Sequence, residues 1–246
     1  MKISFVSDIG QVRSTNQDYT KFFYNQEEFP LVLLADGMGG HKAGDIASHL
    51  VVETLGLKWQ ETDFSIPGTA VEWLVKEIKG LNQFICEKGL DEKFLGMGTT
   101  LEALAIFKGT CVIAHVGDSR SYLIHAGEIL QITQDHSLVN DLFSAGEITE
   151  EEVEDHPQKN IITRSIGMPE DVDVDILEKV FLPGDLLLLC SDGLTNMVSD
   201  EEILEILTNS KGMERALTEL IDLANEKGGK DNITASLIFL EAEDVK

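Results

Sequence analysis

Basic side chains are scarce in this sequence, which has 19 lysine and arginine residues against 44 aspartate and glutamate residues. The formal net charge is therefore −25 at pH 7. A surface of this sign repels the phosphate backbone of DNA or RNA and anionic lipid headgroups, so we expect neither nucleic acid nor membrane as a partner. Long apolar runs are also missing, because no stretch approaches the ~20 residues that a helix needs to cross a bilayer.

Cysteine is rare as well, and the three cysteines, Cys86, Cys111 and Cys190, are far apart in the chain. They form no Cys-x-x-Cys pair, which argues against a thiolate metal site. Cys111 and Cys190 lie in apolar, strand-like runs, where we expect buried free thiols. This usage is typical of a reducing compartment. Because the first residues indicate a strand and no secretory signal, we expect a cytoplasmic protein.

Several common catalytic signatures are absent from the sequence. It contains no His-Glu-x-x-His zinc motif, no Walker phosphate-binding loop and no Gly-x-Ser-x-Gly nucleophile elbow. No cysteine is followed by five residues and an arginine, so cysteine-based hydrolysis of phosphate esters has no nucleophile here. Asp171, Asp173 and Asp175 resemble the start of a calcium loop, but Ile176 and Leu182 occupy positions that require Gly and Glu. We interpret this alternating segment as a strand with one solvated face.

What the sequence does contain is a set of apolar strands that each end in aspartate beside glycine. These units are Leu31–Ala35 with Asp36-Gly37, Val112–Val116 with Gly117-Asp118, and Leu186–Cys190 with Ser191-Asp192-Gly193. One Asp-Gly pair alone is a common turn signal. A carboxylate at the end of a buried strand is costly unless it is paired or metal-bound, so three copies favour a shared acidic pocket. Gly37 lets the backbone approach closely, so a main-chain carbonyl can serve as a further oxygen ligand.

Three candidate ligands, Asp36, Asp192 and Asp231, are expected at strand ends or strand entrances and offer only oxygen atoms. Such ligands suit Mg²⁺ or Mn²⁺ and disfavour Zn²⁺. Two such ions about 3.5–4 Å apart activate a bridging water molecule for attack on phosphorus. Beside them, Arg13 is a candidate clamp for phosphate oxygens, and the alternative for Arg13 is a surface ion pair.

The order of the expected elements favours one α+β domain over residues 1–246, without a repeat or a linker. Strand patterns occupy residues 2–7, 19–24, 29–35, 100–107, 111–116, 121–125, 129–133, 171–176, 186–190 and 232–240. Helical patterns occupy residues 45–58, 69–88, 136–146, 199–207 and 213–224, with capping boxes that begin at Thr69, Thr149 and Ser199. Because strands outnumber helices and the helices come in pairs, we expect antiparallel sheets flanked by helices.

Six short motifs follow one another between residues 7 and 234 and so span nearly the whole chain. They are Ser7-Asp8-x-Gly10-x-x-Arg13-x-x-Asn16-x-Asp18, Ala35-Asp36-Gly37-Met38-Gly39-Gly40-His41, Gly96-Met97-Gly98-Thr99-Thr100, Ala114-His115-Val116-Gly117-Asp118-Ser119-Arg120, Cys190-Ser191-Asp192-Gly193-Leu194 and Lys230-Asp231-Asn232-Ile233-Thr234. With these motifs the sequence resembles the metal-dependent protein phosphatase family, type 2C, in its compact bacterial form.

The resemblance implies a four-layer αββα sandwich, in which two antiparallel sheets pack face to face between helix pairs. It implies hydrolysis of phosphoserine and phosphothreonine in proteins by a metal-bridging hydroxide, in signal transduction opposite a serine/threonine kinase. We expect a monomer, with a variable flap at about residues 138–160 that gates the site. The alternatives are a catalytically inactive, phosphoprotein-binding regulator of the same fold and, less favoured because of the net charge, a metal phosphodiesterase or nuclease.

The resemblance also implies roles for individual residues. By position in the motifs, Asp36 would bridge two ions of Mn²⁺ or Mg²⁺, and Gly37 would give its carbonyl oxygen to one of them. Asp192 and Asp231 would complete the coordination of the other ion. Asp18 would hold the second ion, either directly or through a water molecule.

Further implied roles concern a third ion and the transfer of the phosphoryl group. Asp118 with Asp192 would form the third, weaker metal site of bacterial members, and Arg13 would bind the phosphate. The sequence departs from the eukaryotic pattern at Met38, where that branch has a histidine proposed as the acid for the leaving alkoxide. His41 would protonate the leaving group directly or through water; its alternative role is to order the loop or a metal-bound water.

Overall fold

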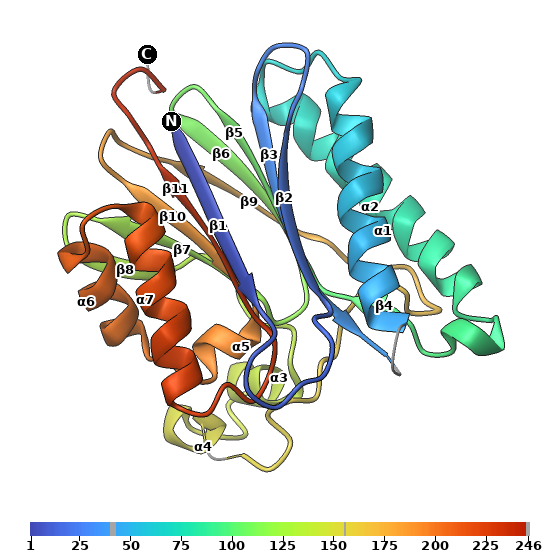
Figure 1. Cartoon of the computed structure of the whole chain (residues 1–246). Helices are drawn as coiled ribbons and strands as arrows, with labels where there is room; N and C mark the ends of the chain where they lie inside the picture. The colour runs from blue at the N-terminus through green and yellow to red at the C-terminus, as the bar shows by residue number, and fades with distance from the viewer. Residues whose placement is uncertain (40–42, 155, 245–246) are drawn as a thin grey trace.

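The computed structural model describes residues 1–39, 43–154 and 156–244. Two antiparallel β-sheets pack face to face in these ranges, and a helix pair covers each outer face (Figure 1). The predicted four-layer arrangement is therefore confirmed. Among the described helices, none combines the length and the apolar character that a membrane crossing requires.

The first sheet joins the two ends of the chain, because its outer strand pairs with the last strand along their full length. Its order is β1 (Lys2–Asp8), β11 (Ile233–Phe239), β10 (Leu186–Cys190), β7 (Arg120–His125) and β8 (Glu128–Gln131). The outer face is covered by α6 (Asp200–Asn209) and α7 (Met213–Glu226). The short helix α5 (Asp192–Thr195) follows β10 directly.

The second sheet is built from the middle of the chain. Its order is β2 (Asp18–Tyr24), β3 (Pro30–Met38), β5 (Leu101–Phe107), β6 (Thr110–Val116) and β9 (Asp175–Val180), with β4 (Gly98–Thr99) paired to the end of β3. Its outer face is covered by α1 (Ala43–Gln60) and α2 (Pro67–Lys88), and a 3₁₀ turn, η1 (Glu92–Phe94), follows.

Strand β3 is buried on both faces, which explains its unbroken apolar sequence. Leu31 and Leu33 pack against the helices on the outer side, whereas Val32 and Leu34 pack between the two sheets. Because side chains alternate along a strand, Asp36 continues the face of Val32 and Leu34. The strand therefore aims a carboxylate into the space between the sheets.

Some predicted element boundaries are wrong. The alternating run from Asp171 is a strand only from Asp175 onward. The chain just before Asp171 is bound to α2, because Asn82 of that helix donates hydrogen bonds to the carbonyls of Met168 and Glu170 at 3.2 and 2.9 Å.

Helix α2 also lacks the predicted cap at its Thr69. It begins at Pro67 after the extended residue Ile66, and no side chain caps it. Proline is favoured in the first turn of a helix, because its fixed φ suits that position and its missing N–H would have had no partner there. The capping box at Ser199 is confirmed, with reciprocal hydrogen bonds between Ser199 and Glu202.

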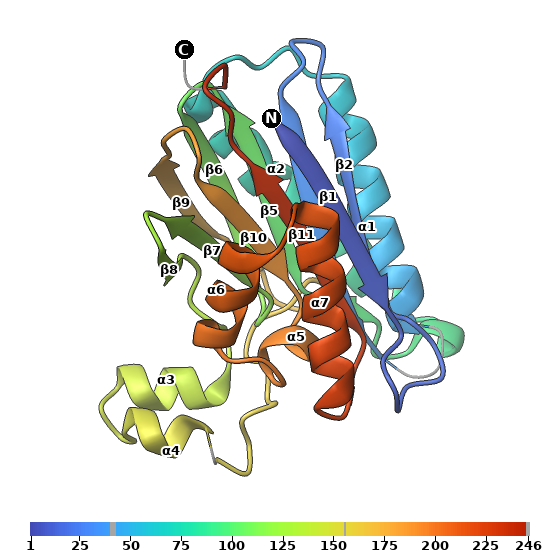
Figure 2. The ribbon, with the colours of Figure 1, turned by 60° about the vertical axis from the view of Figure 1, so that its left-hand side comes forward.

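The segment between β8 and β9 carries two short helices, α3 (Leu138–Ser144) and α4 (Glu150–Glu154), which project from one end of the sandwich (Figure 2). A narrow neck joins it to the body: Leu138 N–H donates to the Ile161 carbonyl and Thr163 N–H to the His136 carbonyl, both at 2.9 Å. The His136 ring in turn accepts a 2.9 Å hydrogen bond from Gly117 N–H. The neck is thereby tied to the turn that carries Asp118.

A first prediction concerns the packing of α1 on β2. A Cβ atom at Gly56 would lie 2.1 to 2.4 Å from atoms of the buried Phe23 ring, whereas a Cβ atom at Gly80 of α2 would meet nothing within 4 Å. We expect Gly56→Ala to lower the free energy of unfolding by about 1–3 kcal/mol through overpacking. We expect the matched control Gly80→Ala to raise it by about 0.5–1 kcal/mol, because alanine favours helix. Urea denaturation of both variants tests this, and stabilisation by Gly56→Ala would contradict the described contact.

Candidate active site

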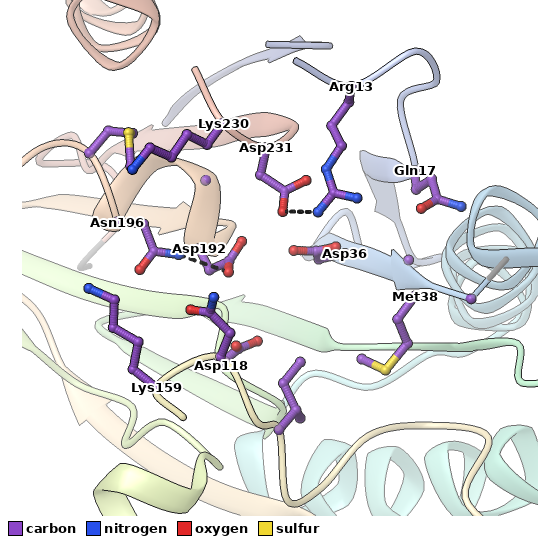
Figure 3. A pocket seen from close by; sticks show the side chains of 16 residues that line it. Arg13, Gln17, Asp36, Met38, Asp118, Lys159, Asp192, Asn196, Lys230 and Asp231 are labelled. Carbon is purple, nitrogen blue, oxygen red and sulfur yellow. Dashed lines mark hydrogen bonds and ion pairs between the residues drawn. The ribbon is translucent and has the colours of Figure 1, made fainter. Parts of the chain in front are cut away.

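The predicted aspartates lie close together, at the same end of both sheets. Four of them, Asp36, Asp118, Asp192 and Asp231, line a pocket of about 480 Å³ (Figure 3). The fifth, Asp18, lies directly opposite Asp36 in the β2–β3 register, so their side chains share one face of the second sheet. Carboxylates that are distant in sequence therefore converge, as the sequence predicts.

Asp36 lies within β3 and not beyond its end, because Gly37 and Met38 extend the strand by pairing with Thr99 and Gly98. Two adjacent threonines hold its backbone. Asp36 N–H donates to Thr100 Oγ1 at 2.9 Å. The Asp36 carbonyl accepts from Thr99 Oγ1 at 2.8 Å and from Thr100 N–H at 2.9 Å. The threonine pair of the third motif thus fixes Asp36 from both sides, a role that sequence reasoning missed.

Asp18 connects the two sheets. Its Oδ2 accepts a hydrogen bond of 2.7 Å from Ser191 Oγ, which follows β10 in the other sheet. Ser191 Oγ itself accepts from Thr234 N–H at 3.0 Å. The serine that precedes Asp192 is therefore a bridge between a strand of one sheet and a carboxylate of the other.

The glycines around the site allow close backbone packing. A Cβ atom at Gly193 would lie 1.9 Å from the Asn232 carbonyl oxygen, and one at Gly10 would lie 2.2 Å from the Asp231 carbonyl oxygen. Gly10 also has a positive φ of 78°. Only glycine fits at these contacts, of which the one at Gly193 brings the start of α5 against the start of β11. Asp192 and Asp231 become neighbours for this reason.

Asn232 fixes the loop that carries Arg13. Its Nδ2 donates to the carbonyls of Ile9 and Thr15 at 2.9 and 3.0 Å, and its Oδ1 accepts from Gln17 N–H at 2.8 Å. Sequence reasoning used Asn232 only as part of a motif. An asparagine between a carboxylate and a buried strand is a signal, because its amide can satisfy peptide groups of a distant loop.

Arg13 reaches over the pocket and donates from Nη2 to Asp231 Oδ2 at 2.7 Å (Figure 3). Its side chain is 52% exposed, so most of it faces the pocket opening or solvent. Arg13 therefore does form an ion pair, which was the alternative role, and its partner Asp231 is itself a residue of the site. Gly37 also lines the pocket, and a Cβ atom there would lie 2.2 Å from the Gly44 carbonyl oxygen. His41 lies outside the described residues.

The site concentrates negative charge away from water. Burial, with the charges of neighbouring carboxylates, raises the pKa of Asp18 to about 7 and that of Asp118 to about 8. Burial, followed by the charge of Asp231, raises the pKa of Asp192 to about 6. The pKa of Asp36 is also well above its ordinary value, because of burial and then the charge of Asp18. Each raised pKa means that a negative charge is unfavourable there without a cation.

Unsatisfied oxygen atoms point to the same conclusion. The Oδ1 atoms of Asp18, Asp118 and Asp192 are buried and have no hydrogen-bond partner in the described part of the chain. Within residues 1–39, 43–154 and 156–244, no three Asp, Glu, His or Cys side chains form a ready-made cage for one ion. The donors that are present are carboxylate oxygens, which suit Mg²⁺ or Mn²⁺, and Mg²⁺ takes one or two carboxylates together with several water molecules. The donors present therefore fit hydrated divalent ions.

Comparisons with known proteins agree with this geometry. Residues 11–238 match the family model described as Protein phosphatase 2C. Over 246 residues, and over the whole length of both proteins, the chain is 46% identical to the protein phosphatase PhpP of Streptococcus pneumoniae.

Solved structures are similar over nearly the whole chain. The serine/threonine phosphatase of S. agalactiae superimposes with a TM-score of 0.96 at 48% identity, covering 98% of this chain and 99% of that one. The catalytic domain of the serine/threonine phosphatase PstP, in complex with two manganese ions, gives a TM-score of 0.83 at 36% identity, with 96% of each chain covered. The chain therefore belongs to the protein phosphatase 2C family.

Proposed function

We propose that this protein hydrolyses phosphoserine and phosphothreonine in other proteins by means of divalent metal ions held in the aspartate pocket. As a member of its family it is a metal-dependent serine/threonine protein phosphatase, and phosphorylated proteins are its substrates. The observation that carries the proposal is the group of carboxylates at a pocket of about 480 Å³, where the Oδ1 atoms of Asp118 and Asp192, like that of the adjacent Asp18, are buried without a hydrogen-bond partner among the described residues.

The aspartates divide into sets that would serve separate ions. Asp36 would lie between two ions of Mn²⁺ or Mg²⁺, with the Gly37 carbonyl and Asp18 on one side. Asp192 and Asp231 would serve the other side. The solved PstP complex with two manganese ions supports this number. Bound there, such a pair would lower the pKa of a shared water molecule and favour its attack on phosphorus.

We also propose a third, weaker site that uses Asp118 and Asp192. The unpartnered Oδ1 atoms of both residues support this assignment. Because Asp192 would then serve two ions, the third ion would meet a carboxylate whose charge is already shared. The third ion would therefore bind with lower affinity.

Arg13 would orient the phosphoryl group. A guanidinium has five N–H donors, and its hydrogen bond to Asp231 uses one of them, which leaves donors for phosphate oxygens. His41 remains our proposal for the acid that protonates the leaving alkoxide of serine or threonine, directly or through water.

We propose that residues 138–160 form a flap on a single domain and gate access to the pocket. The support is that Lys159 and Asn160, at the end of this segment, line the pocket together with the aspartates. We further propose that the protein acts as a monomer opposite a serine/threonine kinase. The inactive-regulator alternative is disfavoured, because the five aspartates are all present and lie together.

The central test is metal-dependent turnover. We expect hydrolysis of a phosphothreonine peptide with Mn²⁺, and none after chelation. Asp36→Asn should reduce kcat/KM by about a thousandfold or more, equivalent to about 4 kcal/mol of transition-state stabilisation, because it replaces a charged, shared carboxylate by a neutral amide with a single oxygen donor. The matched control is Asp222→Asn, at an exposed position of α7. Full activity of the chelated wild-type protein would contradict the proposal, and peptide binding without turnover would favour the regulator.

Arg13→Ala should raise KM for the phosphopeptide about tenfold and change Mn²⁺ affinity little, because the arginine contacts a carboxylate but supplies no metal ligand. Arg215→Ala is the control, since Arg215 pairs with Glu219 on the exposed face of α7. Steady-state kinetics and calorimetric Mn²⁺ titration separate the two quantities. Loss of Mn²⁺ affinity at unchanged KM would assign Arg13 to metal binding instead.

The stability of the metal-free protein should depend on pH. The pKa values of Asp18, Asp118 and Asp192 are raised to about 7, 8 and 6, above the value of about 3.9 in an unfolded chain. The folded state therefore binds these protons more tightly, so its free energy of unfolding should fall as the pH rises through this range. Added Mn²⁺ should oppose the loss. Urea denaturation at about pH 5.5, 7 and 8.5 measures this, and pH-independent stability in chelator would contradict it.

A further inference from the structure

The interface between the two sheets is apolar over much of its area and polar at the end near the aspartates. Among the described residues, four buried side-chain hydrogen bonds cross the interface at this polar end, and we call this set of bonds the polar seam. They join Asp18 to Ser191 at 2.7 Å, Thr20 to Ser236 at 2.7 Å, Thr100 to Ser119 at 2.8 Å and Glu102 to Ser121 at 2.5 Å. In each pair the first residue lies in or beside a strand of the second sheet, and its partner lies in or beside a strand of the first.

The seam matters because the proposed metal ligands are divided between the sheets. Asp18 and Asp36 belong to the second sheet, whereas Asp192 and Asp231 adjoin strands of the first. Apolar contacts between sheets have little directional preference, whereas a hydrogen bond restricts both distance and angle. The spacing of the carboxylates therefore depends on the bonds that fix one sheet against the other.

Thr100 makes the most direct of these connections. Its Oγ1 accepts from Asp36 N–H at 2.9 Å and shares a hydrogen bond of 2.8 Å with Ser119 Oγ. Ser119 follows Asp118 in the chain, and both hydroxyl-bearing residues are fully buried. A Cβ atom at Gly117 would lie 2.5 Å from Thr100 Cγ2, so the turn also packs directly against this threonine. One hydroxyl thus links the backbone of Asp36 to the turn that carries Asp118.

We propose that Thr100 and Ser119 are positioning residues that set the placement of Asp36 relative to Asp118 and thereby the affinity of the pocket for divalent ions. The inference rests on the proposed metal-dependent function. Neither residue supplies a ligand. Their effect is exerted through the peptide group of Asp36 and the turn at Asp118.

The experiment is calorimetric titration of Mn²⁺ into the chelator-treated protein and three variants. Thr100→Val removes the hydroxyl at nearly constant shape, and we expect Mn²⁺ affinity to fall about tenfold or more. Thr100→Ser restores the hydroxyl, and we expect affinity close to that of the wild type. Thr20→Val is the matched control, because the Thr20–Ser236 pair is the same kind of bond in the seam, and the other described hydrogen bond of the Thr20 hydroxyl goes to the Leu33 carbonyl and not to a proposed ligand. It should lower the melting temperature without changing Mn²⁺ affinity.

Wild-type Mn²⁺ affinity in Thr100→Val would overturn the inference, as would equal losses of affinity in Thr100→Val and Thr20→Val. If Thr100→Val fails to fold, Ser119→Ala decides, since it keeps the acceptor of the Asp36 N–H and should weaken Mn²⁺ binding less, about threefold to tenfold. Unchanged affinity in that variant would likewise overturn the inference. A wild-type protein that binds Mn²⁺ but leaves phosphopeptides intact would refute the proposed function alone, and one that binds no Mn²⁺ would refute both.

Discussion

Repulsion between buried carboxylates is the constraint on which this structure depends. Asp18 and Asp36 are adjacent across two strands, and the pKa of each is raised by burial and by neighbouring negative charge. Such an arrangement opposes folding until a cation neutralises it. Apolar layers on both sides of each sheet supply the favourable free energy that holds the two sheets together despite this repulsion. The same carboxylates therefore lower the stability of the metal-free fold and would provide its affinity for metal ions.

The sequence predicted the convergence of the aspartates well, because each follows a recognisable apolar strand and belongs to an ordered set of motifs. Boundaries were less predictable. The Asp36-Gly37 pair is a local turn signal, yet Gly37 continues β3, because it pairs with Thr99, some sixty residues away. The alternation after Asp171 predicts a strand there, but the strand begins only at Asp175, and the chain just before Asp171 is bound to α2 through hydrogen bonds from Asn82 to Met168 and Glu170. Both errors come from long-range contacts, which a local pattern does not contain.

The same reason explains why the supporting polar residues were missed. Thr99 and Thr100 form part of an ordinary strand-like pattern, and only the folded chain places them around the peptide group of Asp36. Ser191 and Asn232 likewise act on distant partners. An aspartate beside an apolar strand is recognisable in a sequence as a candidate ligand, because burying a carboxylate is costly. A hydroxyl or an amide is compatible with many environments and gives no such signal. Ligand candidates are thus easier to predict than the residues that orient them.

The narrow neck below α3 and α4 has a consequence for how proteins of this architecture diversify. The body is joined to that segment by a few main-chain hydrogen bonds among His136, Leu138, Ile161 and Thr163. Insertions, deletions or wholesale replacement between those anchor points would leave every strand pairing of the sandwich unchanged. Because Lys159 and Asn160 of this segment line the pocket, such changes would alter the pocket wall, and with it the preference for targets, while the strands that carry the aspartates stay in place.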